Sequence, residues 1–403
     1  MLKELISTDS KKIALATIPI ILALLMLVAF LFFSGDKYSK DLTIGDGVET
    51  FKELSDKFAE LADKKGGAYA YEVLRHAPLP PQTDLHLLGH VVGEELYKQE
   101  GVGGIRLCTP DFRNACSHSI VIGALAEFGE SALPLIRDAC KEAPGGSGAY
   151  TMCFHGLGHG VFAGYGYELP ETIEFCKLTG TKEYHQREYI ECFGGAIMEL
   201  AGGGGHDPQL WEEARKKYIT EPLAPCLSGV VPRELKEICL TYLTPDIWKA
   251  AGIELGNFEP AKLKEAFGYC DDIATSETDL RRACYEGFGK EFVPLAGARD
   301  IRDISAYSNE DFNRAIAWCT EAGNEQGSAW CIASGLDSIF WGGENDPSAS
   351  FRYCELVTDL GNPAYRTACY SRLAGAIGFF VHAPYERSRL CSQLPHGFQP
   401  VCK

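Results

Sequence analysis

Residues 153–160 read Cys-Phe-His-Gly-Leu-Gly-His-Gly, and related stretches recur along this chain of 403 residues. Each related stretch starts at a cysteine, continues with small residues and then turns to large apolar ones; the cysteines are Cys116, Cys192, Cys284, Cys331 and Cys369. Glycine inside a helix costs about 0.5–1 kcal/mol relative to alanine, so clustered glycines need a compensating contact. Close approach between neighbouring helix backbones is the simplest such contact. We therefore expect each stretch to form a buried inner helix.

The cysteines divide the chain into repeating units. All 16 lie after residue 100, and they form eight consecutive pairs: Cys108–Cys116, Cys140–Cys153, Cys176–Cys192, Cys226–Cys239, Cys270–Cys284, Cys319–Cys331, Cys354–Cys369 and Cys391–Cys402. Successive second cysteines are 33 to 47 residues apart, and a period near 40 is typical of helical-hairpin repeats. An amphipathic segment ends at the first cysteine of each pair, as in residues 130–140 and 310–319. The pattern predicts an all-α fold in which α/α hairpins stack as a solenoid.

Disulfide bonds within the hairpins are the expected role of these cysteines. A high, even count is typical of exported domains, and the sequence contains no C-x-x-C metal motif. The end of one helix and the start of the next antiparallel helix meet at the hairpin turn, which favours pairing between neighbouring cysteines. Other connectivities stay open, because sequence alone does not fix them. The layout is similar to that of extracellular Sel1-like, cysteine-rich helical repeats, although the repeat length and cysteine spacing are longer here.

A segment near the start of the chain predicts a membrane anchor. Residues 13–33 contain 21 residues without a charge, which is enough to cross a hydrocarbon core of about 30 Å as a helix. A cleaved signal peptide would have a shorter apolar core, and the sequence Ser-Gly-Asp-Lys at 34–37 is a poor cleavage site. We expect a cytoplasmic tail at 1–12, one transmembrane helix at 13–33 in contact with membrane lipid, and an extracytoplasmic C-terminal domain at the cell membrane.

The rest of the chain is expected to divide into three parts. Residues 34–81 contain no cysteine and would form a linker and the first outer helix. Residues 82–205 carry histidine-bearing repeats, and residues 206–403 carry cysteine-paired repeats without the histidine cluster. The net charge of −17 argues against nucleic acid as a partner, because a polyanion would repel this chain.

Five of the ten histidines occupy equivalent positions in the first repeats; they are His86, His90, His118, His155 and His159. His118 and His155 lie two residues after a repeat cysteine, and His86 lies two residues after Asp84, which replaces the cysteine. His90 and His159 follow one helical turn later on the same face as His86 and His155. Equivalent positions on packed helices lie about 8–10 Å apart, and two long side chains can bridge that gap. Glu94 continues the row on the first helix, as a ligand, a general base or a hydrogen-bond partner of a histidine.

This register favours a metal site for Zn, Cu, Fe or Ni, because imidazole is the commonest metal ligand. With an open coordination position, such a site would support hydrolytic or redox chemistry, with Glu94 as the candidate catalytic residue. Two alternatives use the same residues. One is a metal-free polar or catalytic cluster. The other is a structural hydrogen-bond network in a non-catalytic scaffold that binds a protein or glycan partner.

Overall fold

The computed structural model describes residues 38–203, 207–254, 257–341, 344–345 and 347–402. These residues are mainly α-helical, as the repeat pattern predicts. One antiparallel pair of two-residue strands joins β1 (Phe340–Trp341) to β2 (Glu344–Asn345). The predicted tail at 1–12 and the predicted anchor at 13–33 lie outside the described residues.

Eight helices, here called the inner helices, pack in chain order. They are α4 (Leu85–Glu100), α5 (Ala115–Phe128), α7 (Gly146–Gly164), α9 (Arg187–Gly202), α12 (Lys236–Tyr242), α15 (Thr278–Ala296), α17 (Glu325–Ser334) and α20 (Pro363–Phe380). Each contacts the next one in this sequence. The other helices are α2 (Phe51–Lys65), α3 (Gly67–His76), η1 (Gly101–Leu107), η2 (Asp111–Asn114), η3 (Gly129–Ala132), α6 (Leu133–Lys141), α8 (Leu169–Lys177), α10 (Pro208–Tyr218), α11 (Ala224–Leu227), η4 (Arg233–Leu235), α13 (Thr244–Ala250), α14 (Pro260–Asp271), η5 (Ile304–Ala306), α16 (Asn309–Thr320), α18 (Leu336–Ile339), α19 (Pro347–Asp359), α21 (Pro384–Gln393) and α22 (Gln399–Cys402).

The expected pairing of neighbouring cysteines is confirmed. All eight consecutive pairs form disulfides, with sequence separations of 8 to 16 residues. Most of these bonds join the end of an outer helix to the first turns of an inner helix, as Cys140 of α6 joins Cys153 of α7. Each bond therefore closes one hairpin and leaves the contacts between hairpins to helix packing.

Several inner-helix glycines lie where helix backbones cross, as the sequence predicts. A Cβ atom at Gly158 of α7 would overlap the carbonyl oxygen of Cys192 on α9, and one at Gly195 of α9 would overlap the carbonyl oxygen of His155. Gly289 of α15 has the same relation to Cys331 of α17. Only a residue without a side chain permits these contacts, so the glycines fix how closely the inner helices approach.

Replacing Gly158 by alanine should lower the free energy of unfolding by about 1–3 kcal/mol or more, because the new methyl group meets backbone that cannot move aside without separating α7 from α9. Gly164, at the end of the same helix, has open space around it, and alanine there should be neutral or stabilise by about 0.4–1 kcal/mol. Urea unfolding midpoints of the two variants test this. Equal midpoints would show that the crossing is not tight.

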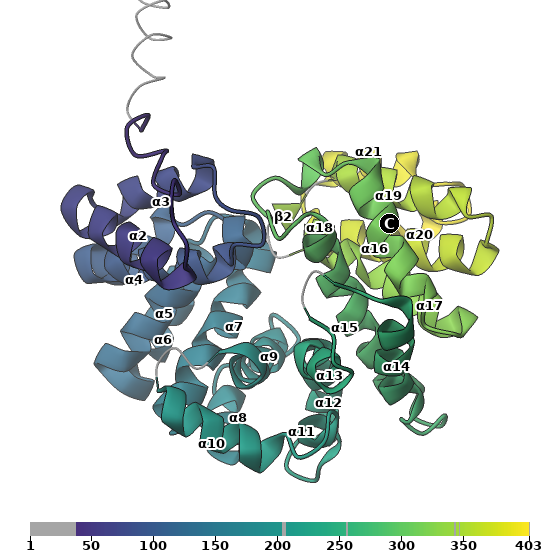
Figure 1. Cartoon of the computed structure of the whole chain (residues 1–403), viewed down its shortest axis with the longest axis horizontal. Helices are drawn as coiled ribbons and strands as arrows, with labels where there is room; N and C mark the ends of the chain where they lie inside the picture. Colours follow the sequence, from purple (N-terminus) through teal and green to yellow (C-terminus); the bar gives the residue numbers. More distant parts are fainter. Residues whose placement is uncertain (1–37, 204–206, 255–256, 342–343, 346, 403) are drawn as a thin grey trace, which may run out of the picture.

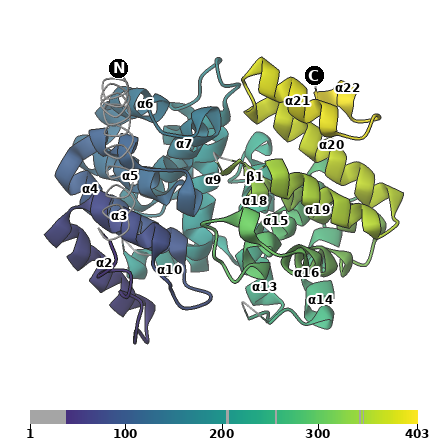
Figure 2. The same ribbon diagram turned by 90° about the horizontal axis from the view of Figure 1, so that it is seen from above.

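The array of inner helices closes on itself. Figure 1 shows the chain passing from α2–α4 at the upper left, through α8–α12 at the bottom, to α15–α20 on the right, and Figure 2 shows the same circuit from above. The loop after α15 meets the segment before α4: the backbone N–H of Gln82 donates to the carbonyl of Ala298 over 3.0 Å, and Arg299 pairs with Asp84. The turn of the chain therefore brings the loop after α15 against the segment before α4, although 215 residues separate Arg299 from Asp84 in sequence.

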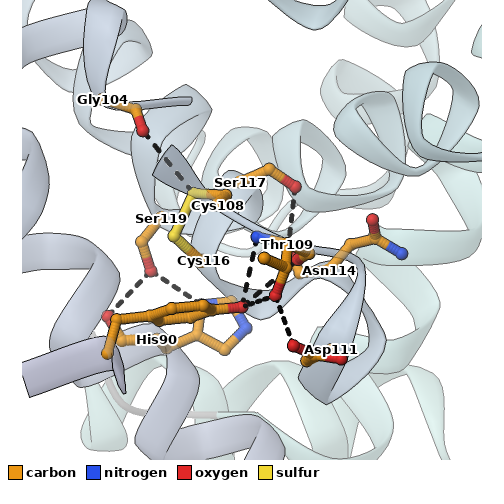
Figure 3. The surroundings of a disulfide bond; sticks show 10 residues. His90, Gly104, Cys108, Thr109, Asp111, Asn114, Cys116, Ser117 and Ser119 are labelled. Atoms are coloured by element: carbon orange, nitrogen blue, oxygen red, sulfur yellow. Dashed lines mark hydrogen bonds between the residues drawn. A yellow bond between two sulfur atoms is a disulfide. The ribbon is translucent and has the colours of Figure 1, made fainter. Parts of the chain in front are cut away.

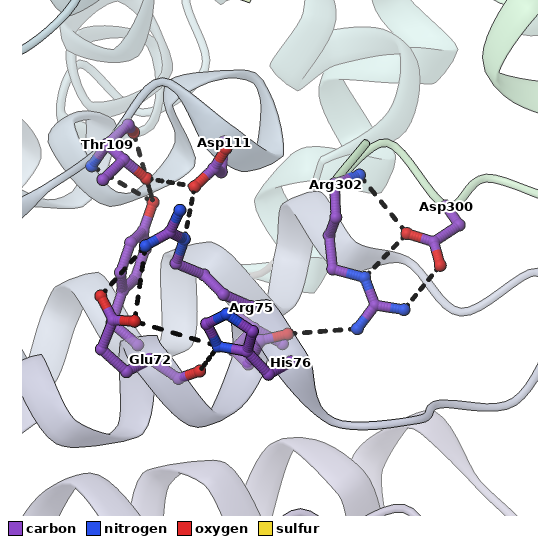
Figure 4. A network of polar contacts seen from close by, with 9 residues as sticks. Glu72, Arg75, His76, Thr109, Asp111, Asp300 and Arg302 are labelled. Atoms are coloured by element: carbon purple, nitrogen blue, oxygen red, sulfur yellow. Dashed lines mark hydrogen bonds and ion pairs between the residues drawn. The ribbon is translucent and has the colours of Figure 1, made fainter. Parts of the chain in front are cut away.

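Arg302 provides the second connection across this closure. Its guanidinium donates to the carbonyl of Ala77 over 2.6 Å and is held by the carboxylate of Asp300. Figure 4 shows this arginine reaching the end of α3, beside a separate network in which Arg75 pairs with Asp111 at 2.7 Å. These contacts use backbone carbonyls at a helix end, which otherwise lack intrahelical partners, and they hold the two ends of the circuit together.

One stretch of the described chain, Asp111–Lys141, is long and apolar enough to cross a membrane by length and composition. It consists of η2, α5, η3 and α6, and it is interrupted at Gly129, which has a φ of 60°. Its longest helix, α5, packs between α4 and α7. A core helix of a globular domain has the same composition, and the packing of α5 agrees with that role.

Candidate metal centre

Three inner helices bring the five predicted histidines into one cluster. They are His86 and His90 on α4, His118 on α5, and His155 and His159 on α7. The helix crossings need small residues to achieve this. A Cβ at Gly156 would overlap His118, and one at Gly93 would meet Ser119 at 2.8 Å. The glycines that weaken these helices are therefore also what allows the imidazole rings to meet.

His118 lies at the centre of the cluster. Its ring centroid is 5.5 Å from that of His86 and 5.6 Å from those of His90 and His155. The centroid of His159 is 6.0 Å away. Within α4 the two rings are 4.7 Å apart, and within α7 they are 5.3 Å apart. A ring at the centre of four others is in the position expected of a shared ligand.

Three of the five histidines converge closely enough to bind one ion. His86, His90 and His118 each offer a nitrogen, and these three atoms lie within 4.8 Å of one another. The Nε2 atoms of His86 and His90 are 3.2 Å apart. His155 and His159 lie beside this group of three, so the structure separates the five candidates into an inner set and a flanking pair.

A strained turn orients His86. Its Nδ1 lies 2.7 Å from the carbonyl oxygen of Phe112, and because a carbonyl only accepts, Nδ1 carries the proton and Nε2 keeps its lone pair. Phe112, Arg113 and Asn114 all have positive φ angles, of 60°, 53° and 62°. Non-glycine residues pay roughly 1–2 kcal/mol each for this conformation, and such strain concentrates at functional sites. Here the strained turn directs the carbonyl oxygen of Phe112 toward the ring of His86.

Ser119 orients His90, as Figure 3 shows. Its hydroxyl oxygen lies 3.0 Å from Nδ1 of His90 and 2.9 Å from the carbonyl oxygen of the same residue. A hydroxyl has one hydrogen. When that hydrogen goes to the carbonyl, Nδ1 donates to the serine oxygen, and Nε2 of His90 presents its lone pair to Nε2 of His86. When the hydrogen goes to Nδ1, Nε2–H of His90 donates to His86 instead.

Several buried polar atoms of the cluster have no hydrogen-bond partner among the described residues. They are both ring nitrogens of His118 and Nε2 of His159, whereas Nδ1 of His155 and Oε2 of Glu191 face each other at 3.6 Å. His118 is only 1% exposed. Leaving a buried donor or acceptor unsatisfied costs about 1–3 kcal/mol, and proteins rarely tolerate it without a ligand or function. The donor set, made of imidazole nitrogens with carboxylates nearby, fits a transition metal.

Burial keeps three histidines of the cluster, His86, His118 and His155, uncharged. It lowers the pKa of His86 to about 4 and that of His155 to about 3, and it lowers the pKa of His118 well below its usual range, with further lowering from the neighbouring imidazoles. Burial opposes ionisation of Glu191, but the Arg187 guanidinium beside it holds the pKa of this carboxyl below its usual value. Neutral imidazole is the form that binds metal, so the environment prepares these side chains as ligands.

The metal-free protein should lose stability as the pH falls from about 6.5 to about 4. In this window the unfolded chain protonates these histidines and the folded chain does not, so protons favour unfolding. Each unit of lowered pKa corresponds to about 1.4 kcal/mol, which gives a loss of several kcal/mol over the window. Urea midpoints measured against pH test this. The variant His155→Phe serves as the control and should show a shallower slope; equal slopes would contradict the assignment.

A cavity of about 940 Å³ lies against the cluster. His86, His90 and His159 line it, and its other walls come from α2, α5, α9, α13, α15 and the loop at 299–301. Residues of the histidine-bearing part of the chain and residues after position 206 therefore both line the cavity. Exposed side chains such as Leu87 and Glu94 also line it, so the cavity is open to solvent on that side.

Glu94 lies on the cavity wall on the exposed face of α4, and it is not one of the three residues whose ligand atoms converge. Glu199 of α9, which the sequence pattern did not single out, is 95% buried and lies on the same wall. Its carboxylate is 3.0 Å from Nδ1 of His159. Glu199 lies seven residues after Cys192, and no histidine of the pattern lies seven residues after its own repeat cysteine. The contact between Glu199 and His159 is therefore visible only in the folded structure.

The geometry is the basis for assigning a function to this chain. Comparison with models of protein families, with curated proteins and with solved structures finds no match.

Proposed function

We propose that this protein is a membrane-anchored, extracytoplasmic metalloprotein whose centre is built by His86, His90 and His118. The observation that carries the proposal is His118, a buried imidazole whose nitrogens lack hydrogen-bond partners in the described structure, while the cluster's other two ligand atoms lie within 4.8 Å. A bound cation would satisfy this ring. Zn, Cu, Fe and Ni all suit an imidazole set.

The spacing of the α4 nitrogens agrees with a shared ion. Two imidazoles that bind Zn at about 2.0–2.1 Å in tetrahedral geometry have nitrogens about 3.3–3.4 Å apart. The Nε2 atoms of His86 and His90 are 3.2 Å apart. Phe112 fixes the tautomer of His86 by accepting from Nδ1, which is how proteins commonly orient metal-binding histidines.

Three protein ligands and a neighbouring cavity favour a catalytic centre over a structural one. Structural zinc sites use four protein ligands, whereas catalytic sites use three and keep one position for water or substrate. The metal would supply Lewis acidity or redox chemistry at that position. His159, held by Glu199 and facing the same cavity, is placed to accept a proton, and Glu94 is a second candidate base nearer the solvent.

Features of the sequence and the disulfides support the proposed location. The apolar segment 13–33 would anchor it, residues 1–12 would face the cytoplasm, and the eight disulfides favour an oxidising compartment for the rest. We further propose that the hairpins form a closed solenoid, with residues 34–81 as linker and first outer helix. Residues 82–205 would supply the metal ligands, and residues 206–403 would complete the cavity.

The second candidate is a metal-free scaffold that binds a protein or glycan. The observation that favours it is the alternative hydrogen-bond chain from Ser119 through His90 to His86, which satisfies these two rings without an ion. That chain leaves His118 without a partner, which is why we prefer the metal centre.

X-ray absorption spectroscopy of the full-length, zinc-loaded protein tests the proposal. We expect three imidazole nitrogens and one oxygen at about 2.0–2.1 Å. The variant His118→Asn should reduce the imidazole count. A spectrum dominated by water oxygens, unchanged in the variant, would support the scaffold instead.

A further inference from the structure

The wall of the 940 Å³ cavity is mostly apolar. Side chains that share this character come from several elements: Phe51 on α2, Leu85 and Val91 on α4, Ile122 on α5, Met198 on α9, Trp248 on α13 and Leu295 on α15. Small-molecule sites have volumes of about 300–1,000 Å³ and are lined mainly by apolar residues with a few convergent polar groups. Here the convergent polar groups are the histidines.

The buried and half-buried charged side chains on the wall are paired within the protein, whereas Glu94 and Lys98 lie on the exposed face of α4. Arg299 pairs with Asp84, and Arg113 pairs with Glu291 at 3.3 Å. The carboxylate of Glu199 is occupied by His159. An ion pair that is satisfied within the protein gives little attraction to a charged ligand, because breaking it exposes an unpaired buried charge. The cavity away from the histidines is therefore suited to an uncharged, apolar body.

The cavity wall includes α2, the first described α-helix after the proposed anchor. Tyr38, the first described residue, packs against Tyr69 of α3 with ring centroids 4.9 Å apart. It follows the last residue of the apolar segment, Phe33, by five positions, so at most about 18 Å of extended chain separates them. Phe51 at the start of α2 is 40% exposed and lines the cavity. The first described residue and the cavity wall therefore meet the same pair of packed helices, α2 and α3.

We infer that the cavity binds the apolar chain of a membrane-derived amphiphile, with its oxygen-bearing polar end facing His86, His90 and His159. The inference deepens the proposed function, because the polar end would then meet the metal centre. The apolar walls hold the chain, and the histidines are the polar groups positioned to meet its head.

Photolabelling of the full-length protein tests this inference. The protein is placed in phosphatidylcholine vesicles with a 16-carbon alcohol that carries a diazirine, and labelled peptides are identified after irradiation. We expect label in 85–98 and 291–301 as well as in the apolar segment. Excess unlabelled 16-carbon alcohol should remove the label from the two cavity peptides while the apolar segment remains labelled.

Cavity-filling variants provide the matched comparison. Val91→Trp and Leu295→Trp should lower cavity labelling by at least about tenfold, which corresponds to 1.4 kcal/mol of binding free energy. Leu135→Trp, at an exposed position of α6 outside the cavity wall, should leave it unchanged. Label confined to other surfaces, or label that the unlabelled alcohol does not displace, would overturn the inference whether or not the tryptophan variants fold.

Cavity labelling and metal binding can be tested independently of each other. Cavity labelling that persists in His118→Leu, together with loss of metal, supports both proposals. Stoichiometric metal in a protein whose cavity takes no label would overturn the amphiphile and leave the metal centre standing. Specific cavity labelling in a wild-type protein that binds no metal would retain the apolar ligand and remove the proposed function.

Discussion

Replacing His118 by leucine should abolish tight metal binding, with affinity falling more than about 100-fold, since loss of groups that merely orient metal ligands already costs 10–100-fold. The central ring supplies the third ligand atom of the group formed with His86 and His90. Isothermal titration with zinc, on full-length wild type and variant, measures the change.

The stability of the same variant distinguishes a ligand from a structural residue. Both imidazole nitrogens of His118 lack hydrogen-bond partners in the described structure, so leucine, of similar size, removes a desolvation cost and no hydrogen bond. The metal-free variant should therefore be at least as stable as the metal-free wild type, and metal should no longer raise its Tm. A metal-free variant that is destabilised by several kcal/mol would mean that His118 holds the core together through a polar network.

Reducing the disulfides should unfold the helical repeats. The eight bonds close loops of 8 to 16 residues, and each such bond contributes about 2–4 kcal/mol. Their sum exceeds the 5–15 kcal/mol that is typical of a folded domain. Helices such as α7 cannot compensate, because six of its 19 residues are glycine and each glycine costs about 0.8–1.0 kcal/mol of helix propensity relative to alanine. Circular dichroism before and after reduction measures the loss.

Variants that each lack one disulfide are the controls for full reduction. Replacing Cys140 and Cys153 together by serine should cost about 3 kcal/mol, and replacing Cys391 and Cys402 should cost a similar amount, because their loops are 13 and 11 residues long. The first bond holds α7, which packs against the ligand His118 through Gly156, so only that variant should also weaken metal binding. A reduced protein that keeps its helices and melts cooperatively would show that packing alone sustains the fold.

The disulfide pairing and the histidine cluster were predictable because both follow local rules. Antiparallel neighbours bring Cys140 to Cys153, and a fixed offset from each cysteine puts His118 and His155 on matching faces of consecutive helices. Backbone contact at Gly158 also follows from the cost of glycine in a helix. In each case the packing of neighbouring helices determines both the spacing of the residues in the sequence and their contact in the structure.

Closure of the array was not predictable. It depends on Arg302 donating to the carbonyl of Ala77 and on the backbone contact between Gln82 and Ala298. Backbone carbonyls carry no sequence signal, and an arginine in a loop is usually solvated. An open array would have no cavity bounded by α4 and α15, so the largest feature of the site depends on contacts that no periodicity encodes.

The residues that orient the histidines were missed for a similar reason. Phe112, Arg113 and Asn114 adopt left-handed conformations, and no glycine marks the turn. Glu199 reaches His159 from a neighbouring helix, at a position outside the histidine register, whereas Glu94 was noticed because it continues a row on one helix. Partners on the same helix can be predicted from spacing, whereas partners across helices need the packing.

Metal content of the full-length, oxidatively folded protein tests the central claim most directly. Elemental mass spectrometry after loading with Zn, Cu, Fe and Ni in turn, followed by desalting, should find close to one ion per chain. That ion should be lost in His86→Ala and largely retained in His155→Ala, because His86 belongs to the converging set and His155 does not. No retained metal in the folded wild type, or equal retention in wild type and His86→Ala, would contradict the metal centre.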